Sequence, residues 1–321
     1  MRVSFTSGFA AMALSACVLS CGGGGSQGPT PVVATPTPRP SGWGTGTALT
    51  IVSGVTDTPV AGARVVVAGI AQPATDAGGQ TALAGAANEG ATVDIEAAGF
   101  LTRQTVVRYG TTRLSLWPDD ATLPGSYTQK LVYTSATEAD SESLVPLDRL
   151  PPRVRTLSLV PTDAIQADPR AMAAHRQAAD YFNVAVQGRT VFSVGGTTDM
   201  SVATRIDPSE ESCAGEPGTL IAFSWTSGHE ITRAEIVFCS EAPSRLPTPI
   251  THELAHVFGL GHSSDRRDVM YPYYRTNDEH GFSDREVLTM GLIYLRRGGN
   301  TWPDNDRTAA SNERRLRVFV N

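Results

Sequence analysis

The chain has 321 residues, of which 40% are apolar, and a formal net charge of −6 at pH 7. This length suggests about two folded units with accessory segments, and the apolar content fits a globular protein. Lys130 is the only lysine, and the acidic balance leaves no basic stripe for a phosphate backbone, so we exclude nucleic acid as a partner.

Residues 1–21 have the layout of an export signal, because Arg2 precedes an apolar run that is too short to span a bilayer. Residues 14–17 and 18–21 each resemble the bacterial lipobox, which implies a lipid-carrying cysteine. We expect an exported lipoprotein, anchored to a membrane through Cys21 or, alternatively, Cys17, and facing the periplasm or the cell exterior. An ordinary secretory signal is the other reading.

Residues 22–46 are mostly Gly, Pro and Thr, and this composition predicts a tether. Residues 47–117 contain short β-branched runs separated by turns, which predict a small all-β sandwich. The stretches TPVAGARVVVAG and VDIEAAGFLTRQ are similar to carboxypeptidase regulatory-like domains. That resemblance implies a transthyretin-like sandwich that serves as a spacer, stabiliser or binding module.

Residues 118–150 are turn-rich and acidic, and we interpret them as a connector. In residues 151–300 the pattern is mixed, so we expect an α+β domain. Ser283 and Glu286 predict a capped helix near its end, and residues 301–321 are expected to form a polar tail. The strands are expected at 156–160, 190–194, 200–206, 219–225 and 234–238, and another helix over 168–186.

Cys213 and Cys239 are the only cysteines after the signal segment. In an oxidising compartment they could form a disulfide, and two buried free thiols are the alternative.

The sequence THELAHVFGLGH, residues 251–262, places His252 and His256 four residues apart. On a helix they project from one side, and two imidazoles one turn apart can share a zinc ion. We expect Pro249 in the first turn of this helix and Thr248 as its N-cap.

A third zinc ligand, His262, follows Gly259, which can end the helix in a left-handed conformation. Three histidines leave one position for water, whose pKa zinc lowers. Glu253, beside the first ligand, is placed to accept the proton of that water as a general base and later to donate it to the departing amine.

The full pattern H-E-x-x-H-x-x-G-x-x-H is typical of the metzincin zinc endopeptidases, and it continues here as a matrixin-like sequence. Ser263 follows the third histidine directly, Asp265 lies three residues after it, and Met270 lies eight after it. The resemblance implies one catalytic Zn²⁺ on His252, His256 and His262, Glu253 as general base and acid, and Met270 as the floor of a Met-turn.

The resemblance also implies a twisted mixed sheet packed on the active-site helix, and a protein or peptide substrate. Pro272 and Tyr274 match the Pro-x-Tyr wall of the pocket for the substrate side chain. An extended substrate is expected to pair with an edge strand, for which residues 219–225 and 234–238 are the two candidates.

The chain departs from matrixins in two features, and its acidic run raises a separate question about calcium. It has no Pro-Arg-Cys-Gly stretch, so latency through a propeptide cysteine is not expected. The remaining histidines, His175, His229 and His280, lack the spacing of a structural zinc site. The acidic run 207–212 offers carboxylates to Ca²⁺, but no ligand spacing recurs and we interpret it as a solvated loop.

Two other functions use the same residues. One is a surface binding lipoprotein with a vestigial zinc site, and the other is a zinc hydrolase of a non-peptide substrate. Glu253 argues against the first, because a purely structural metal site gains nothing from an adjacent base. The sequence does not define an oligomeric state.

Overall fold

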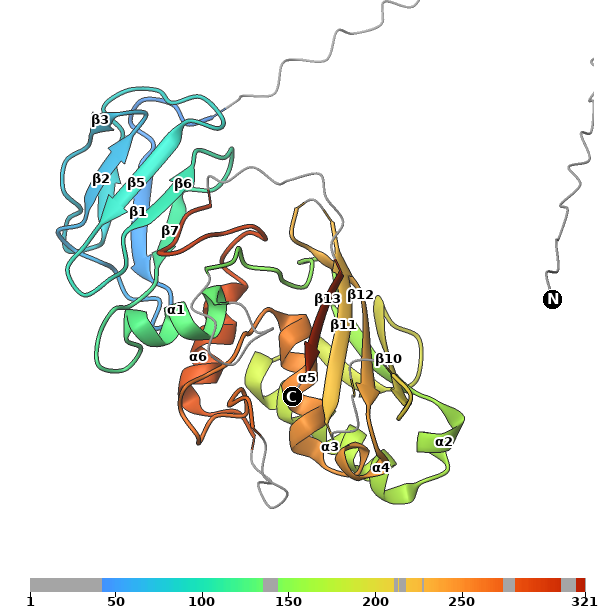
Figure 1. Ribbon diagram of the computed structural model, residues 1–321. Helices are drawn as coiled ribbons and strands as arrows, with labels where there is room; N and C mark the ends of the chain where they lie inside the picture. The colour runs from blue at the N-terminus through green and yellow to red at the C-terminus, as the bar shows by residue number, and fades with distance from the viewer. Residues whose placement is uncertain are drawn as a thin grey trace, which may run out of the picture. The chain divides into compact units, whose positions relative to one another are not determined.

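Figure 1 shows the computed structural model of the chain. The structure describes residues 42–134, 144–210, 213, 218–226, 228–273, 281–306 and 316–320. Among these residues, no helix is both long and apolar enough to cross a membrane.

Two sheets form the N-terminal part, as the β-branched runs predict. A three-stranded sheet has the order β4-β1-β7, and a four-stranded sheet has the order β3-β2-β5-β6. Alternate side chains of both sheets, including Leu49, Ile51, Val65, Val93 and Ile95, meet in one fully buried core. The strands are β1 (Ala48–Ser53), β2 (Arg64–Val67), β3 (Ile70–Ala71), β4 (Gln80–Ala82), β5 (Thr92–Glu96), β6 (Arg103–Val106) and β7 (Arg113–Leu116).

A six-stranded mixed sheet with the order β13-β11-β12-β10-β8-β9 forms the second part. The strands β9, β8, β10 and β12 are parallel to one another, whereas β11 is antiparallel to both β12 and β13. The five strands expected from the sequence are all present, and β13 is an addition to them. The strands are β8 (Thr156–Pro161), β9 (Val191–Val194), β10 (Met200–Ile206), β11 (Thr219–Trp225), β12 (Ile231–Phe238) and β13 (Leu316–Val320).

Helices α3 and α5 pack against each other, and α5 packs against β11 and β12 (Figure 1). Asp168 caps α3 by accepting hydrogen bonds from the N–H groups of Arg170 and Ala171. Helix α5 therefore contacts both helix α3 and the six-stranded sheet. The helices are α1 (Gly125–Tyr133), α2 (Asp163–Gln166), α3 (Pro169–Val186), α4 (Glu241–Ser244), α5 (Pro247–Phe258) and α6 (Asp284–Ile293).

Helix α1 lies in the segment that we interpreted as a connector, so the structure differs from that expectation. Leu131 and Tyr133 are fully buried in the same core as α5. The carbonyl oxygen of Leu131 accepts a hydrogen bond of 2.6 Å from the N–H of Gly261. The segment therefore supports the loop that follows α5, a role that its turn-rich composition does not reveal.

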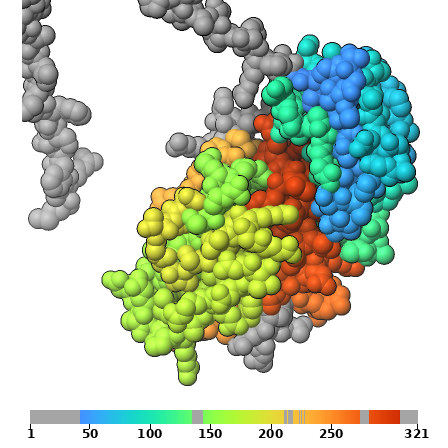
Figure 2. Space-filling view, turned by 180° about the vertical axis from the view of Figure 1, so that it is seen from behind, coloured from blue at the N-terminus to red at the C-terminus, as the bar shows by residue number. Residues whose placement is uncertain are grey.

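The chain after α6 also differs from the polar tail expected from the sequence, because Asp304 and Asp306 are buried. The N–H of Gln104, on β6, donates to Asp304 O at 2.8 Å, and Asp306 N–H donates to Gln104 O at 2.9 Å. Two buried ion pairs, Arg103 with Asp306 at 3.0 Å and Arg296 with Asp304 at 2.7 Å, accompany these bonds. In Figure 2 residues of the C-terminal part, in red, lie between the blue residues of the sandwich and the yellow-green residues of the second part.

Cys213 and Cys239 form a disulfide with Cα atoms 5.5 Å apart, and both residues are buried. The bond connects the end of β12 to the segment before β11, which the reach of a disulfide allows.

Candidate metal centre

Helix α5 begins two residues earlier than expected. Its N-cap is Leu246, which makes no side-chain cap, and Pro247 occupies the first turn. The prediction that Thr248 is the N-cap was therefore wrong, because either proline is compatible with a first turn and the sequence alone does not choose between them. All 12 residues of α5 are buried, so its histidine face is covered as well as its apolar face.

Gly259 ends α5 in the left-handed region, with φ of 111°. A Cβ at this position would lie 2.6 Å from the carbonyl oxygen of Asp148. Both the backbone angle and the close approach require glycine here. The chain then reverses and returns His262 to the face of the helix that carries the other two histidines.

His252, His256 and His262 lie together, and each offers one nitrogen within 4.8 Å of the nitrogens of the others. Their ring centroids are 4.8, 5.1 and 5.3 Å apart. The three side chains are 2–4% exposed. The tertiary structure thus brings together the three residues that the spacing selects, in a group able to hold one metal ion.

Backbone carbonyls orient two of the imidazoles. Nδ1 of His252 lies 2.7 Å from Val269 O, and Nδ1 of His256 lies 2.7 Å from Leu260 O. Because a carbonyl only accepts, each Nδ1 carries the proton and each Nε2 keeps its lone pair. Burial lowers the pKa of His252 to about 4, and burial followed by the charges of the other two histidines lowers the pKa of His256. Both rings are therefore neutral at neutral pH, as metal ligands must be.

Met270 lies in a tight turn that is fixed to the metal-site loop. The N–H of Ser263 donates to Met270 O at 2.7 Å, and Met270 is fully buried. Ser263 Oγ and the hydroxyl of Tyr127, on α1, both donate to Asp268 Oδ2, at 2.5 and 2.7 Å. The buried carboxylate of Asp268 thus joins α1, the loop after His262 and the turn.

Sequence reasoning assigned no role near the site to Asp268 or Tyr127. Asp268 lies two residues before the expected turn methionine, and a buried carboxylate there has to find donors. The closeness of Asp268 to Met270 in the sequence was the only signal for its role. No signal pointed to Tyr127, because it lies 141 residues before Asp268 in the sequence.

The other predicted residues have varied positions. Glu253, on α5, is 1% exposed, and Pro272 is half-buried after the Met270 turn. Asp265 forms an ion pair of 2.6 Å with Arg267, which with the Arg267 N–H holds the pKa of Asp265 at about 2. Four residues fall outside the described part of the chain, namely Tyr274, His280, Cys17 and Cys21.

The remaining histidines in the described part lie away from the trio. His175 is buried, with Nδ1 2.8 Å from Ala171 O and Nε2 3.0 Å from Thr204 Oγ1. His229 Nδ1 lies 2.7 Å from Asp148 Oδ1. In the acidic run, Asp207 and Glu210 pair with Arg205.

Comparison with known proteins identifies the family that this site resembles. Residues 193–294 match the matrixin family model. The matched segment begins in β9 and ends after α6, so it contains the histidine trio, Glu253 and the Met270 turn.

Human matrilysin is 40% identical over 52 residues, which are 16% of this chain and 20% of the matrilysin chain. The chain thus aligns with only a fifth of that relative. Metalloproteinase-II from Bacteroides fragilis superposes with a TM-score of 0.28 and 14% identity, over 63% of this chain and 76% of the other. The match to the matrixin family model and the matrilysin alignment support a matrixin-like metalloprotease.

Proposed function

We propose that the protein is a zinc-dependent endopeptidase that hydrolyses peptide bonds of proteins. One observation carries the proposal. Three buried imidazoles converge within 4.8 Å in the matrixin-like segment, and Glu253 lies on the same helix as two of them. Three histidines are the donor set of a catalytic zinc site, and carbonyl partners on Nδ1 are the outer contacts such ligands need.

His252, His256 and His262 would hold the zinc ion, which when bound supplies Lewis acidity and lowers the pKa of water. Glu253 accepts the proton of the attacking water and delivers it to the departing amine. Met270 forms the apolar floor beneath the imidazoles, and its buried turn keeps His252 in place through the carbonyl of Val269.

We propose β11 as the strand that pairs with an extended substrate. Strand β12 has neighbours on both sides, β10 and β11, so it offers no free edge. The outer edge of β11 carries β13, which is antiparallel to it and pairs Leu220 with Val320 through Ser224 with Leu316. A substrate strand therefore has to replace β13, because both use the same backbone groups of β11.

Pro272 and Tyr274 remain our proposal for the wall of the substrate side-chain pocket, by resemblance to matrixins. Zinc is the only cofactor that we propose. We propose export and lipid anchoring on the strength of residues 1–21. A Cys21→Ser variant should leave the membrane fraction of expressing cells, whereas Cys17→Ser should remain there. The opposite result would assign the lipid to Cys17.

The decisive experiment compares wild type with Glu253→Ala for cleavage of an unstructured protein, together with the zinc content of both. We expect one zinc per chain in both proteins and a loss of cleavage of about 10²- to 10⁴-fold in the variant. Equal zinc with no cleavage of any peptide by wild type would favour a binding lipoprotein. Hydrolysis of other esters or amides alone would favour a non-peptide hydrolase.

A further inference from the structure

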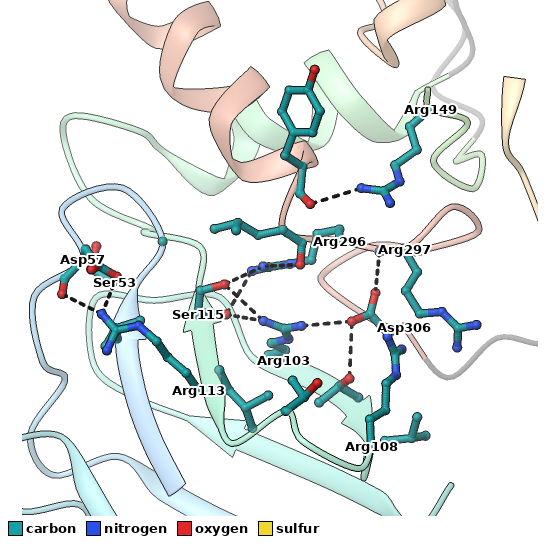
Figure 3. A pocket seen from close by; sticks show the side chains of 18 residues that line it. Ser53, Asp57, Arg103, Arg108, Arg113, Ser115, Arg149, Arg296, Arg297 and Asp306 are labelled. Carbon is teal, nitrogen blue, oxygen red and sulfur yellow. Dashed lines mark hydrogen bonds and ion pairs between the residues drawn. The ribbon is translucent and has the colours of Figure 1, made fainter. Parts of the chain in front are cut away.

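A cavity of about 330 Å³ lies where the sandwich meets the chain after α6 (Figure 3). It is lined from β1, β6 and β7 on one side and from residues 294–297 and Asp306 on the other. Its lining is unusual in charge, because six guanidinium groups face two carboxylates, those of Asp57 and Asp306. The arginines are Arg103, Arg108, Arg113, Arg149, Arg296 and Arg297.

Three of these arginines have a carboxylate partner. Arg103 pairs with Asp306, and Arg113 pairs with Asp57 at 2.5 Å. Arg296 pairs with the buried Asp304 behind the cavity wall. Of these pairs, Arg103 with Asp306 joins the sandwich to the C-terminal segment, whereas Arg113 pairs within the sandwich and Arg296 within the C-terminal segment. Ion pairing within the protein therefore accounts for half of the cluster.

The other three arginines, Arg108, Arg149 and Arg297, form no ion pair with any residue that the structure describes. Arg149 Nη1 donates to the carbonyl oxygens of Ile293 and Tyr294, at 3.2 and 3.1 Å. Arg108 and Arg297 therefore leave two charges near the cavity without a carboxylate partner.

Among the described residues, the Asp306 carboxylate attracts Arg108 at longer range but accepts its four hydrogen bonds from groups other than the Arg108 and Arg297 side chains. Oδ2 accepts from Arg103 at 3.0 Å and from Thr105 at 3.3 Å. Oδ1 accepts from Asn300 at 2.9 Å and from the backbone N–H of Arg297 at 3.3 Å. The Asp306 carboxylate therefore connects the sandwich to the segment after α6.

Arg108 has a buried donor, Nη2, without a hydrogen-bond partner in the described part of the protein. Burial and then the positive charge of Arg297 lower the pKa of Arg108. The carboxylates of Asp306 and Glu89 act on this pKa in the opposite direction, and Arg108 stays charged because a guanidinium does not lose its proton in proteins. Figure 3 shows the Arg108 and Arg297 side chains on the same side of Asp306.

We propose that this cavity binds an anion carrying a phosphate or sulfate group, with Arg108 and Arg297 as its principal donors. Planar guanidinium forks match the oxygens of such groups. A volume of about 330 Å³ exceeds the space of a bare oxyanion, and it lies at the small end of pockets for organic ligands. A phosphate or sulfate ester of about monosaccharide size fits this space.

The experiment measures calorimetric titration and thermal unfolding with three additives at equal ionic strength: inorganic phosphate, glucose 6-phosphate and chloride. We expect saturable binding and a rise in Tm for at least one phosphate compound and neither effect for chloride. Tighter binding of glucose 6-phosphate would indicate an ester as ligand, and equal or tighter binding of inorganic phosphate would indicate the free ion.

Two variants assign the donors. Arg108→Gln and Arg297→Gln should each weaken binding by at least about tenfold, since each removes charge-assisted hydrogen bonds. Arg64→Gln is the matched control, because Arg64 lies on β2 with an exposed ion pair to Glu96, outside the cavity lining. If a glutamine variant does not fold, Arg108→Lys should fold and retain part of the affinity.

The proposal fails if no phosphate compound binds more strongly than chloride. It also fails if Arg108→Gln and Arg297→Gln fold and bind as the wild type does. Either result would leave the arginines as a structural joint only. The measurement does not depend on peptidase activity, so it remains informative whatever the metal centre does.

Discussion

Glu286 Oε1 accepts a hydrogen bond of 2.8 Å from the backbone N–H of Met270, which ties α6 to the Met270 turn. The other oxygen, Oε2, accepts from the N–H of Ser283 at 2.8 Å and completes the capping box expected from the sequence. One buried carboxylate thus caps a helix and holds the turn. Its second function depends on a contact 16 residues away in the chain.

Glu286 should make stability depend on pH. Burial, followed by the charge of Asp268, raises the pKa of Glu286 to about 7. Because the folded value is above the unfolded value of 4.5, the folded state binds more protons, and its stability falls as pH rises from about 4.5 through 7. The difference corresponds to on the order of 3 kcal/mol. Urea unfolding at pH 4 and pH 8 measures it.

The control for this prediction is Glu286→Gln, which keeps an acceptor oxygen and does not titrate. Between pH 4 and pH 8 the free energy of unfolding of the variant should change less than that of the wild type. The difference between the two changes should be on the order of 3 kcal/mol. A wild type and a variant with parallel pH profiles would contradict the prediction.

Replacing Gly259 with alanine should destabilise the fold by about 2 to 4 kcal/mol, because it combines a positive φ with a backbone clash against Asp148 O. It should also lower zinc content, since His262 follows the turn. Gly62→Ala is the matched control, with φ of 72° and no atom within 4 Å of the added Cβ. That control should cost about 1 kcal/mol. Equal losses in the two variants, measured by urea unfolding, would disprove the steric argument.

Replacing only one partner of the buried ion pair between Arg296 and Asp304 should strongly destabilise the fold. Both side chains are 0% exposed, so Arg296→Ala leaves a carboxylate buried without its cation, at a cost of about 3 to 5 kcal/mol. The corresponding Arg64→Ala change breaks an exposed pair with Glu96 and should cost less than about 1 kcal/mol. Similar free energies of unfolding for the two variants would show that the pair does not stabilise the joint with the sandwich.

Weakening β13 should raise peptidase activity if substrates pair with β11. The double substitution Val318→Pro and Phe319→Pro removes two consecutive backbone N–H groups, so it disrupts antiparallel pairing whichever of them bonds to β11. We expect kcat/KM for an unstructured peptide to rise several-fold, because the free edge becomes more populated. The matched control, with alanine at both positions, keeps both N–H groups and should change kcat/KM less. A folded proline variant with unchanged or lower kcat/KM would refute a competing role for β13.

Local patterns in the sequence determined much of this protein. The strands β8 to β12, the helix α3 and the capping box of α6 lie where the residues predict them, and the histidine helix α5 is present with a start two residues earlier than predicted. The reason is physical: side-chain period and capping chemistry act over a few residues, and a four-residue spacing places two histidines on one helix face whatever the rest of the chain does.

Only the tertiary structure decided the contacts between distant segments. It showed that β13 covers the edge of β11, that Asp304 and Asp306 are buried with Arg296 and Arg103, and that Tyr127 and Ser263 share Asp268. Such contacts depend on the global packing of elements up to 203 residues apart, for which no local periodicity exists. The polar composition of residues 301–306 predicts an exposed tail, and only the tertiary structure brings Arg103 and Arg296 to the carboxylates that are buried there.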